Sequence, residues 1–371
     1  MNVERSRLRM GTLLWGAVAG TALVIILVEM STTRRPLGFS LAASITNGLQ
    51  FGAVFSLIAL GVALVYRSTK VINFAQGELG TVPALLVLWA LLGFDLAGDL
   101  DLAQVGTLRL IGYAAVAIVV GALLGMLVNV AVVQRLKDAS PVTSLVATAG
   151  LTLFLTSLEL ITFEARARPF PRFISGAPAG FKIGPLCVSQ LERETGRCLG
   201  GSGSLAVGGE VVPWNTILVV LVLAGVSLAL AAFFRSRAGV ALLATAQEPF
   251  AAELYGVSPR GMSTLAWGAA GAFGALAGLL GAGVFAQITP GLMTATFLVP
   301  GLVGAVLGGL TSMVGAVVGG LIVGVVFALS NSVVLAAGLN SVIPGPPFLA
   351  VFLVLVIVLL VRPQGLFGKG A

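Results

Sequence analysis

The chain of 371 residues contains no histidine, only two cysteines and few charged side chains. Without histidine, neither a Ser-His-Asp nor a Cys-His catalytic set can form, and a metal site of the usual kind is not expected. Charged residues make up 9% of the chain, whereas they make up about 25% of a soluble globular protein. These absences argue against an enzyme and against a soluble fold, and we expect neither a cofactor nor a bound metal.

The basic residues and the glycines give no sign of nucleic-acid or nucleotide binding. The net charge is +7, but the basic residues occur as small clusters between apolar runs and never as one continuous patch. The phosphate-binding pattern G-x-x-x-x-G-K-[ST] is absent, because Gly368-Lys369-Gly370 lacks both the spacing and the hydroxyl. We therefore expect no nucleic acid partner and no ATP hydrolysis by this chain alone.

Long apolar runs dominate the sequence. Hydrophobic residues make up 58% of the chain, and the mean hydropathy is +1.07. Runs of about 17–25 residues can cross a bilayer, and they occur near 11–30, 41–66, 71–94, 108–134, 141–163, 214–234, 263–287 and 346–361. The glycine-rich stretch 297–336 holds two more, with a break near Thr311-Ser312. The expected fold is an all-α, polytopic transmembrane helix bundle of about ten spans.

The N-terminal residues are expected to stand apart from the main transmembrane domain, 36–371. Residues 1–35 comprise a basic arm and the apolar run 11–30. That run is longer than a signal-peptide core of roughly 7–15 residues. We therefore expect a retained extra first span.

The basic residues indicate how the spans are oriented. If the N-terminus is inside the cell, the long polar segment 164–213 lies outside and the loop 235–262 lies inside. The inner connections then hold these 12 of the 21 Lys and Arg residues: Arg5, Arg7, Arg9, Arg67, Lys70, Arg135, Lys137, Arg235, Arg237, Arg260, Arg362 and Lys369. Because basic residues concentrate in cytoplasmic connections, both termini of this multi-pass protein are predicted to be cytoplasmic.

Glycines recur four residues apart in several spans, which places small residues on one face of each helix and allows close packing in lipid. The pairs are Gly48/Gly52, Gly121/Gly125, Gly274/Gly278, Gly304/Gly308, Gly315/Gly319 and Gly320/Gly324. Together they predict a tightly packed bundle.

The outer segment 164–213 contains both cysteines, Cys187 and Cys198. They lie on the side that is predicted to be oxidising, so a disulfide bond between them is expected. In the chain-entropy model such a bond contributes on the order of 3 kcal/mol. Two reduced thiols are the alternative.

The stretch VINFAQGELG, residues 71–80, places a carboxylate and two amides at membrane depth. An ionisable group there is costly and usually faces a cavity or the bundle interior, which makes Glu78 a candidate for the solute path. Asn73 and Gln76 offer hydrogen bonds beside it, and Asn47 and Gln50 in the second span could line the same path. A helix-capping or interfacial Glu78 is the alternative.

The run QFGAVFSLIALGVALVYRSTKVINFAQGELG, residues 50–80, resembles the hallmark segment of permease subunits of branched-chain amino acid ABC importers of the LivH type. That family has an I-N-F-A-H-G-E core, and Gln76 stands where histidine is usual. Further resemblances are SPVTSLVATAGLTLFL at 140–155, ATAQEPFAAELYGVSPRGM at 244–262, GAVLGGLTSMVGAVVGGLIVG at 304–324 and RPQGLFG at 362–368. The first span and the insert around 182–210 look longer than is usual in that family.

The resemblance implies an ABC importer permease fold in a bacterial cytoplasmic (inner) membrane. Its implied partners are ABC ATPase subunits, a second homologous permease and an extracytoplasmic solute-binding protein. The solute would be a branched-chain amino acid or a related small polar compound.

The cytoplasmic loop 235–262 contains the segment EPFAAELYG, residues 248–256. Pro249 suits a first helical turn, and Phe250 and Leu254 share one face at i and i+4. The segment resembles the E-A-A-x-x-x-G coupling loop of ABC importers, with Phe250 in place of the glutamate. The candidate ATPase-coupling residues are Glu248, Phe250, Ala251, Ala252, Leu254 and Gly256.

A transporter of another class remains an alternative at this stage. An ion-coupled secondary transporter would use Glu78 as its coupling site and broken helices at the membrane midplane. Such a protein needs no docking helix in the loop 235–262. A purely structural membrane protein leaves the NFAQGE segment unexplained.

Overall fold

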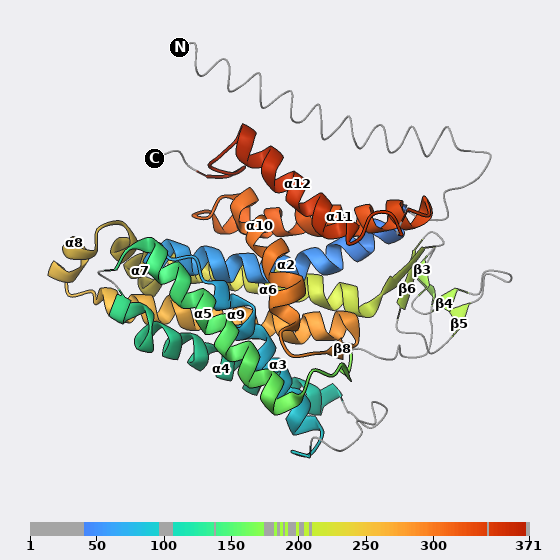
Figure 1. The fold of residues 1–371 in the computed structure, drawn as a ribbon, viewed down its shortest axis with the longest axis horizontal. Helices are drawn as coiled ribbons and strands as arrows, with labels where there is room; N and C mark the ends of the chain where they lie inside the picture. Colours follow the sequence, from blue (N-terminus) through green and yellow to red (C-terminus); the bar gives the residue numbers. More distant parts are fainter. Residues whose placement is uncertain are drawn as a thin grey trace, which may run out of the picture.

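The structure is a computed structural model that describes residues 41–95, 107–136, 139–173, 182–183, 186–187, 190–191, 198–199, 204–207, 210–339 and 341–368. Long helices form a bundle, with the short helix α8 at one end and short strands at the other (Figure 1). We call these the α8 end and the strand end. The predicted first span, 11–30, lies outside the described residues, as does the proposed arm in 1–35.

The helices in chain order are α2 (Leu41–Thr69), η1 (Phe74–Gln76), α3 (Glu78–Leu91), α4 (Thr107–Ala131), η3 (Val133–Leu136), α5 (Pro141–Phe163), α6 (Trp214–Arg235), α7 (Arg237–Gln247), α8 (Pro249–Leu254), α9 (Pro259–Phe285), the π-helical η4 (Met293–Leu298), α10 (Val299–Gly308), α11 (Met313–Ala336) and α12 (Pro346–Val361). Seven described helices are long and apolar enough to cross a membrane, and Met293–Gly308 and Pro346–Val361 are shorter apolar helices. The predicted all-α transmembrane bundle is confirmed, and its span number holds approximately.

Local sequence explains where several of these helices begin. Ser140, Ser236, Ser258 and Ser312 each precede a helix and accept a hydrogen bond from a backbone N–H three residues later. These contacts satisfy donors that have no partner within the helix. Proline follows at the start of α5 and α9, where its missing N–H and fixed φ cost little.

Helix α2 is the centre of the bundle, and α5 and α6 lie at its periphery. In α2, 83% of the most apolar stretch is buried, against 22% in α5 and 17% in α6. The core around α2 includes Phe55 and Phe297, whose rings meet edge to face. Apolar side chains on the outer faces of α5 and α6 therefore face lipid or another chain.

The predicted glycine pairs lie at helix contacts. Gly48 and Gly52 of α2 approach the backbone of α11, while Gly121 and Gly125 of α4 approach the backbone of α9 around Gly271. Gly274 and Gly278 of α9 approach Gly80 of α3, and Gly304/Gly308 of α10 approach Gly315/Gly319 of α11. Gly320 and Gly324 of α11 approach α2 at Ser56 and Gly52. The prediction of close packing through small residues is confirmed.

We expect Gly271→Ala to lower the stability of the bundle, because its Cβ would collide with the backbone carbonyl of Gly121. Overpacking of this kind costs about 1–3 kcal/mol. The matched control is Gly225→Ala in α6, where nothing lies within 4 Å of the added Cβ. Thermal unfolding in detergent should show a lower midpoint for Gly271→Ala only, and equal midpoints would contradict the packing argument.

Short antiparallel strands lie at the strand end. Strand β1 (Arg168–Pro169) pairs with β8 (Gln287–Ile288). Strands from residues 182–213 form a sheet in the order β2-β3-β6-β7 and a separate pair β4-β5. Their bounds are β2 (Lys182–Ile183), β3 (Leu186–Cys187), β4 (Gln190–Leu191), β5 (Cys198–Leu199), β6 (Ser204–Val207) and β7 (Glu210–Pro213).

The two cysteines lie on strands of different pairs, Cys187 in β3 and Cys198 in β5. Their side chains lie outside the described part of the structure. No disulfide bond is found among the side chains that are described, and the bond between Cys187 and Cys198 stays a prediction.

Candidate functional site

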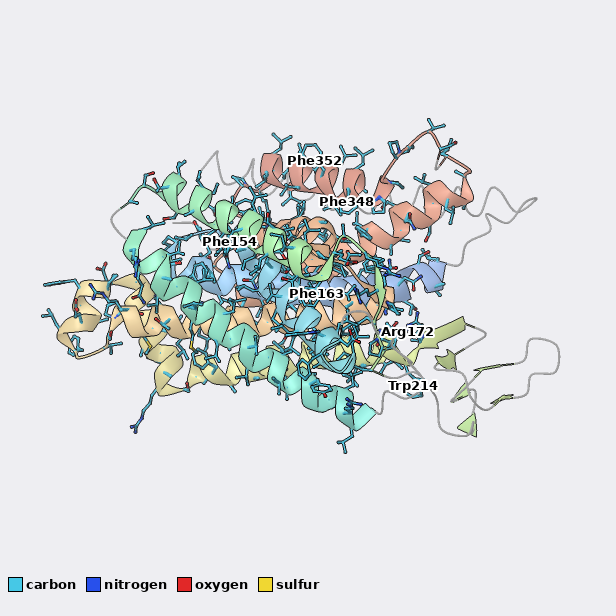
Figure 2. All side chains as sticks on the ribbon, turned by 60° about the horizontal axis from the view of Figure 1, so that its bottom comes forward. Phe154, Phe163, Arg172, Trp214, Phe348 and Phe352 are labelled. Atoms are coloured by element: carbon cyan, nitrogen blue, oxygen red, sulfur yellow. The ribbon has the colours of Figure 1, made fainter. Side chains whose placement is uncertain are left out.

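Polar side chains form a stripe along α5. Ser144, Thr148, Thr152, Thr156 and Glu159 recur at intervals of four and three residues, which places them on one helix face. All are buried except Thr156, which is half-buried. The opposite face is apolar and exposed, as at Phe154 (Figure 2). Helix α5 therefore turns its polar face toward the bundle, and we call this face the α5 polar stripe.

The VINFAQGELG segment lies against the α5 polar stripe and is not helical at its start. The Thr148 hydroxyl accepts from the Phe74 N–H at 3.4 Å, and its single proton is shared between the carbonyls of Leu145 at 3.0 Å and Ile72 at 3.3 Å. Asn73 Oδ1 accepts from the Ala75 N–H at 3.0 Å and caps η1. The backbone groups of Ile72, Phe74 and Ala75, which lie between α2 and α3, thus have hydrogen-bond partners inside the bundle. A chain embedded in a membrane requires such partners.

The third span, expected near 71–94, does not begin as a regular helix. Residues 71–73 are extended, η1 follows, and α3 begins at Glu78. Extended residues rise about 3.3 Å each and helical residues about 1.5 Å. Glu78 therefore lies further from residue 71 along the chain than a continuous helix would place it.

Gln76 is fully buried and fixes this segment to two neighbouring helices. Its Nε2 donates to the Ala270 carbonyl of α9 at 2.9 Å, and its Oε1 accepts from Asn73 Nδ2 at 3.2 Å. The amide also packs against Gly61 of α2, where a Cβ would collide with it. Asn73 and Gln76 therefore position the backbone before Glu78.

Glu78 and Glu159 form a buried carboxyl pair. Glu78 Oε1 accepts from the Thr156 hydroxyl at 2.7 Å, and Glu159 Oε2 accepts from the Gly291 N–H at 2.8 Å. The remaining oxygens, Glu78 Oε2 and Glu159 Oε1, have no donor among the described residues. The two carboxyl groups lie close enough to repel each other when both are charged.

The charge of the pair has no cationic counterpart in the described part of the chain, where neither carboxylate forms an ion pair. Glu78 is 0% exposed and Glu159 is 3% exposed. Two buried carboxyl groups without a cationic partner are costly, because burial removes them from water. The pair is therefore suited to receive a cationic group.

The π-helical η4 closes the site from the other side. Its Met293 N–H donates to the Thr81 hydroxyl at 3.3 Å. Thr294 lies so close to Gly77 that a Cβ on Gly77 would collide with the Thr294 hydroxyl, and among the described residues that buried hydroxyl has no hydrogen-bond partner. π-Helical turns are frequent at functional sites. This one places the Thr294 hydroxyl beside Gly77, the residue that precedes Glu78.

The carboxyl pair lies toward the strand end of the bundle. Helix α5 starts at the α8 end, where Gln134 just before it donates to the Arg260 carbonyl at the start of α9. Thr156 and Glu159 follow Pro141 by 15 and 18 residues, or about 22 and 27 Å along the 23-residue helix. With the predicted orientation, the pair lies in the outer part of the membrane.

The structure brings together only part of the predicted path. Asn73, Gln76 and Glu78 meet at the α5 polar stripe, but Asn47 is exposed on α2, and Gln50 accepts from the Thr216 hydroxyl of α6 at 3.1 Å. Glu159 lies near the end of an apolar run, as an interfacial residue would, but it is buried against Gly291. The threonines of α5 were missed, although their four-residue spacing is visible in the sequence.

The predicted coupling segment forms α8 at the α8 end. Phe250 is 73% exposed, Leu254 is 74% exposed and Ala252 is buried. Gly256 has a φ of +80°, and the Val257 N–H donates to the Ala252 carbonyl at 3.0 Å, which ends the helix as predicted. Glu248 and Ala251 are exposed as well. This short helix presents two large apolar side chains with no cover from the described part of the chain.

Residues 44–361 match the family described as "Branched-chain amino acid transport system / permease component". The permease protein BraD of Pseudomonas aeruginosa, named for high-affinity branched-chain amino acid transport, is 26% identical over 88% of this chain and 95% of its own length. The LivH permease proteins of Salmonella typhimurium and Escherichia coli K12, named for the same transport, are 29% and 28% identical over 87% of this chain and 94% of their own. No solved structure matches significantly.

These relatives lend no support to the ion-coupled secondary transporter. The match covers nearly all of the described transmembrane helices, from the first turn of α2 to the end of α12. The chain therefore belongs to the family of permease components of branched-chain amino acid transport systems.

Proposed function

We propose that this chain is the transmembrane permease subunit of an ATP-driven importer for branched-chain amino acids in the bacterial cytoplasmic membrane. The observation that carries the proposal is the carboxyl pair Glu78 and Glu159, buried at membrane depth against the α5 polar stripe. A buried pair with unused acceptor oxygens is suited to a cationic group. The ammonium group of an amino acid supplies that charge.

Solute movement requires the α5 polar stripe to separate from the segment 72–78. In the structure the two are held together by hydrogen bonds of Thr148 with Ile72 and Phe74 and of Thr156 with Glu78. Each such bond contributes about 0.5–1.5 kcal/mol, or up to about 3 kcal/mol when charged. Separating two segments that are joined by a few polar contacts costs less free energy than separating two segments that form a packed apolar interface.

The partners proposed for this chain follow from its exposed surfaces. ATPase subunits, which must supply the missing nucleotide site, contact Phe250 and Leu254 on α8. A second homologous permease covers part of the exposed apolar faces of α5 and α6, and membrane lipid covers the rest. A solute-binding protein delivers the amino acid at the strand end, and both termini are cytoplasmic.

Uptake of radiolabelled leucine tests the proposal in cells that lack their own branched-chain uptake and express this chain with its ATPases, second permease and binding protein. Arsenate, which depletes ATP, should abolish uptake, whereas a protonophore added while ATP is maintained should leave it intact. The reverse pattern would establish ion coupling. Cross-linking from position 250 should recover a P-loop ATPase from the same membranes.

A further inference from the structure

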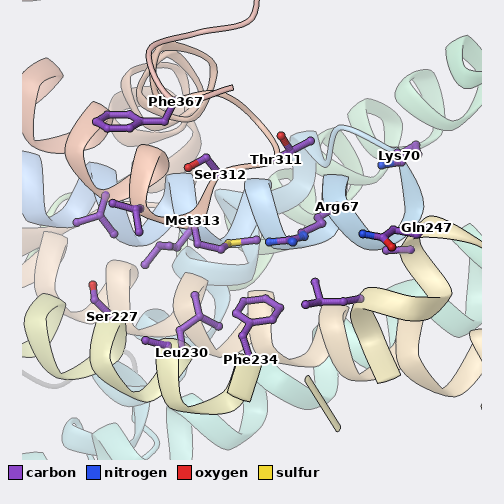
Figure 3. Close-up of a pocket in the computed structure, with 16 residues that line it drawn as sticks. Arg67, Lys70, Ser227, Leu230, Phe234, Gln247, Thr311, Ser312, Met313 and Phe367 are labelled. Atoms are coloured by element: carbon purple, nitrogen blue, oxygen red, sulfur yellow. The ribbon is translucent and has the colours of Figure 1, made fainter. Parts of the chain in front are cut away.

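A cavity of about 560 Å³ lies at the α8 end, between α2, α6, α7 and the turn that precedes α11 (Figure 3). Arg67 and Lys70 extend into it from the end of α2, and Gln247 reaches it from the end of α7. Thr311 and Ser312 contribute hydroxyls from the turn. This cavity is separate from the carboxyl pair, which lies toward the other end of the bundle.

The cavity is cationic, because none of the described residues that line it is acidic. The Arg67 guanidinium lies over the Phe234 ring, 5.2 Å from its centroid. This contact fixes the plane of the group and leaves its N–H donors available at the edges. In the described part of the chain, neither Arg67 nor Lys70 forms an ion pair.

The start of α11 adds to this positive potential. Ser312 caps the helix by accepting from the Gly315 N–H at 3.0 Å, while Met313 and Val314 line the cavity at the first helical positions. The first N–H groups of a helix have no partner within it and favour an anion. The charged side chains and the backbone N–H donors therefore both favour an anionic ligand.

The deeper wall of the cavity is apolar. Leu60 precedes Arg67 by seven residues on α2, and Leu230 precedes Arg235 by five residues on α6. At 1.5 Å per residue these side chains lie about 10 and 8 Å further into the bundle. The cavity is thus cationic near the membrane surface and apolar within the membrane.

We propose that this cavity binds the phosphate headgroup and upper acyl chain of an anionic phospholipid. Phosphate oxygens would accept from Arg67, Lys70 and the start of α11, and the acyl chain would contact Leu60 and Leu230. Basic pockets between transmembrane helices suit such headgroups. A free phosphate ion shares the headgroup's chemistry but leaves the apolar wall unused.

Native mass spectrometry of the detergent-solubilised full chain, titrated with phosphatidylglycerol or phosphatidylcholine, tests this proposal. Phosphatidylglycerol should bind more tightly, and the double variant Arg67→Gln/Lys70→Gln should weaken its binding about 30-fold, or about fivefold for each charge. Arg235→Gln/Arg237→Gln is the matched control, because it removes two charges from the same end outside the cavity. This control should bind phosphatidylglycerol as tightly as the wild type does.

A second variant separates the effect of the lost charge from the effect of losing the Arg67 contact with Phe234. Thr311→Glu adds a negative charge at the rim and removes no aromatic contact, so it should weaken phosphatidylglycerol binding to a similar extent. Equal binding by all variants, or equal binding of both lipids, would overturn the proposal. Displacement of the lipid by inorganic phosphate at an equal concentration would identify the free anion as the ligand and overturn it as well.

Discussion

Uptake by the double variant Glu78→Gln/Glu159→Gln should fall by at least about 100-fold, while the amount of folded protein in the membrane stays unchanged. Glutamine keeps the carbonyl oxygens that accept from Thr156 and the Gly291 N–H. Two amides can also hydrogen-bond to each other, so the contact between α3 and α5 survives. What the variant loses is the negative charge of the pair.

The expected size of the decrease in uptake follows from the free energy that a hydrogen bond to a charged group contributes. A bond to a charged group contributes about 1.5–3 kcal/mol, which corresponds to roughly 10- to 150-fold for each carboxylate that serves the solute. Each single variant retains one carboxylate and should fall between the wild type and the double variant. The measurement is the initial rate of leucine uptake, divided by the amount of permease that elutes as a folded species from detergent.

Glu164→Gln is the matched control for this prediction. Glu164 follows the last residue of α5 and is exposed, so the same change there should leave uptake unaltered. Wild-type uptake by the double variant would remove the carboxyl pair from the solute path. A decrease that only follows a decrease in folded protein would assign the pair a role in stability alone.

The span boundaries could be predicted because they depend on local sequence. Apolar runs set the length of each helix, and serine followed by proline marks the starts of α5 and α9. The break near Thr311-Ser312 was also correct, since Ser312 caps α11. These signals lie within a few residues of the boundary that they determine.

The interior of the site could not be predicted in the same way, because its residues are satisfied by distant ones. The extended start of the third span depends on Thr148, and the burial of Glu159 depends on Gly291. Near the end of an apolar run, Glu159 resembles an interfacial residue. The position of Asn47 apart from this group has another cause: α2 is apolar on almost every side, so periodicity does not indicate which of its faces meets the α5 polar stripe.

Uptake should also be lost in the double variant Phe250→Asp/Leu254→Asp, and in this case the ATPase should no longer copurify with the permease. The two side chains are 73% and 74% exposed on α8, and no described part of the chain covers them. Large apolar residues at the centre of an interface contribute about 2 kcal/mol or more each, or roughly 30-fold in affinity. Introducing two carboxylates adds the cost of burying charge.

The stability of the permease itself should be unaffected by this change. Ala252, which packs inward, is retained, and Gly256 still ends the helix at a φ of +80°. Leu339→Asp is the matched control, since this residue is 44% exposed just after α11 at the opposite end of the bundle. It should leave both copurification and uptake unchanged.

The pairing of measurements separates coupling from assembly. If the ATPase still copurifies and hydrolyses ATP but leucine does not enter, α8 transmits the motion without being required for attachment. If neither copurification nor uptake changes, α8 has no part in either step, and another surface at this end of the bundle must receive the ATPase. Loss of copurification with a normal thermal midpoint for the isolated permease is the result expected, because the exposed apolar pair serves the interface and contributes little to the fold.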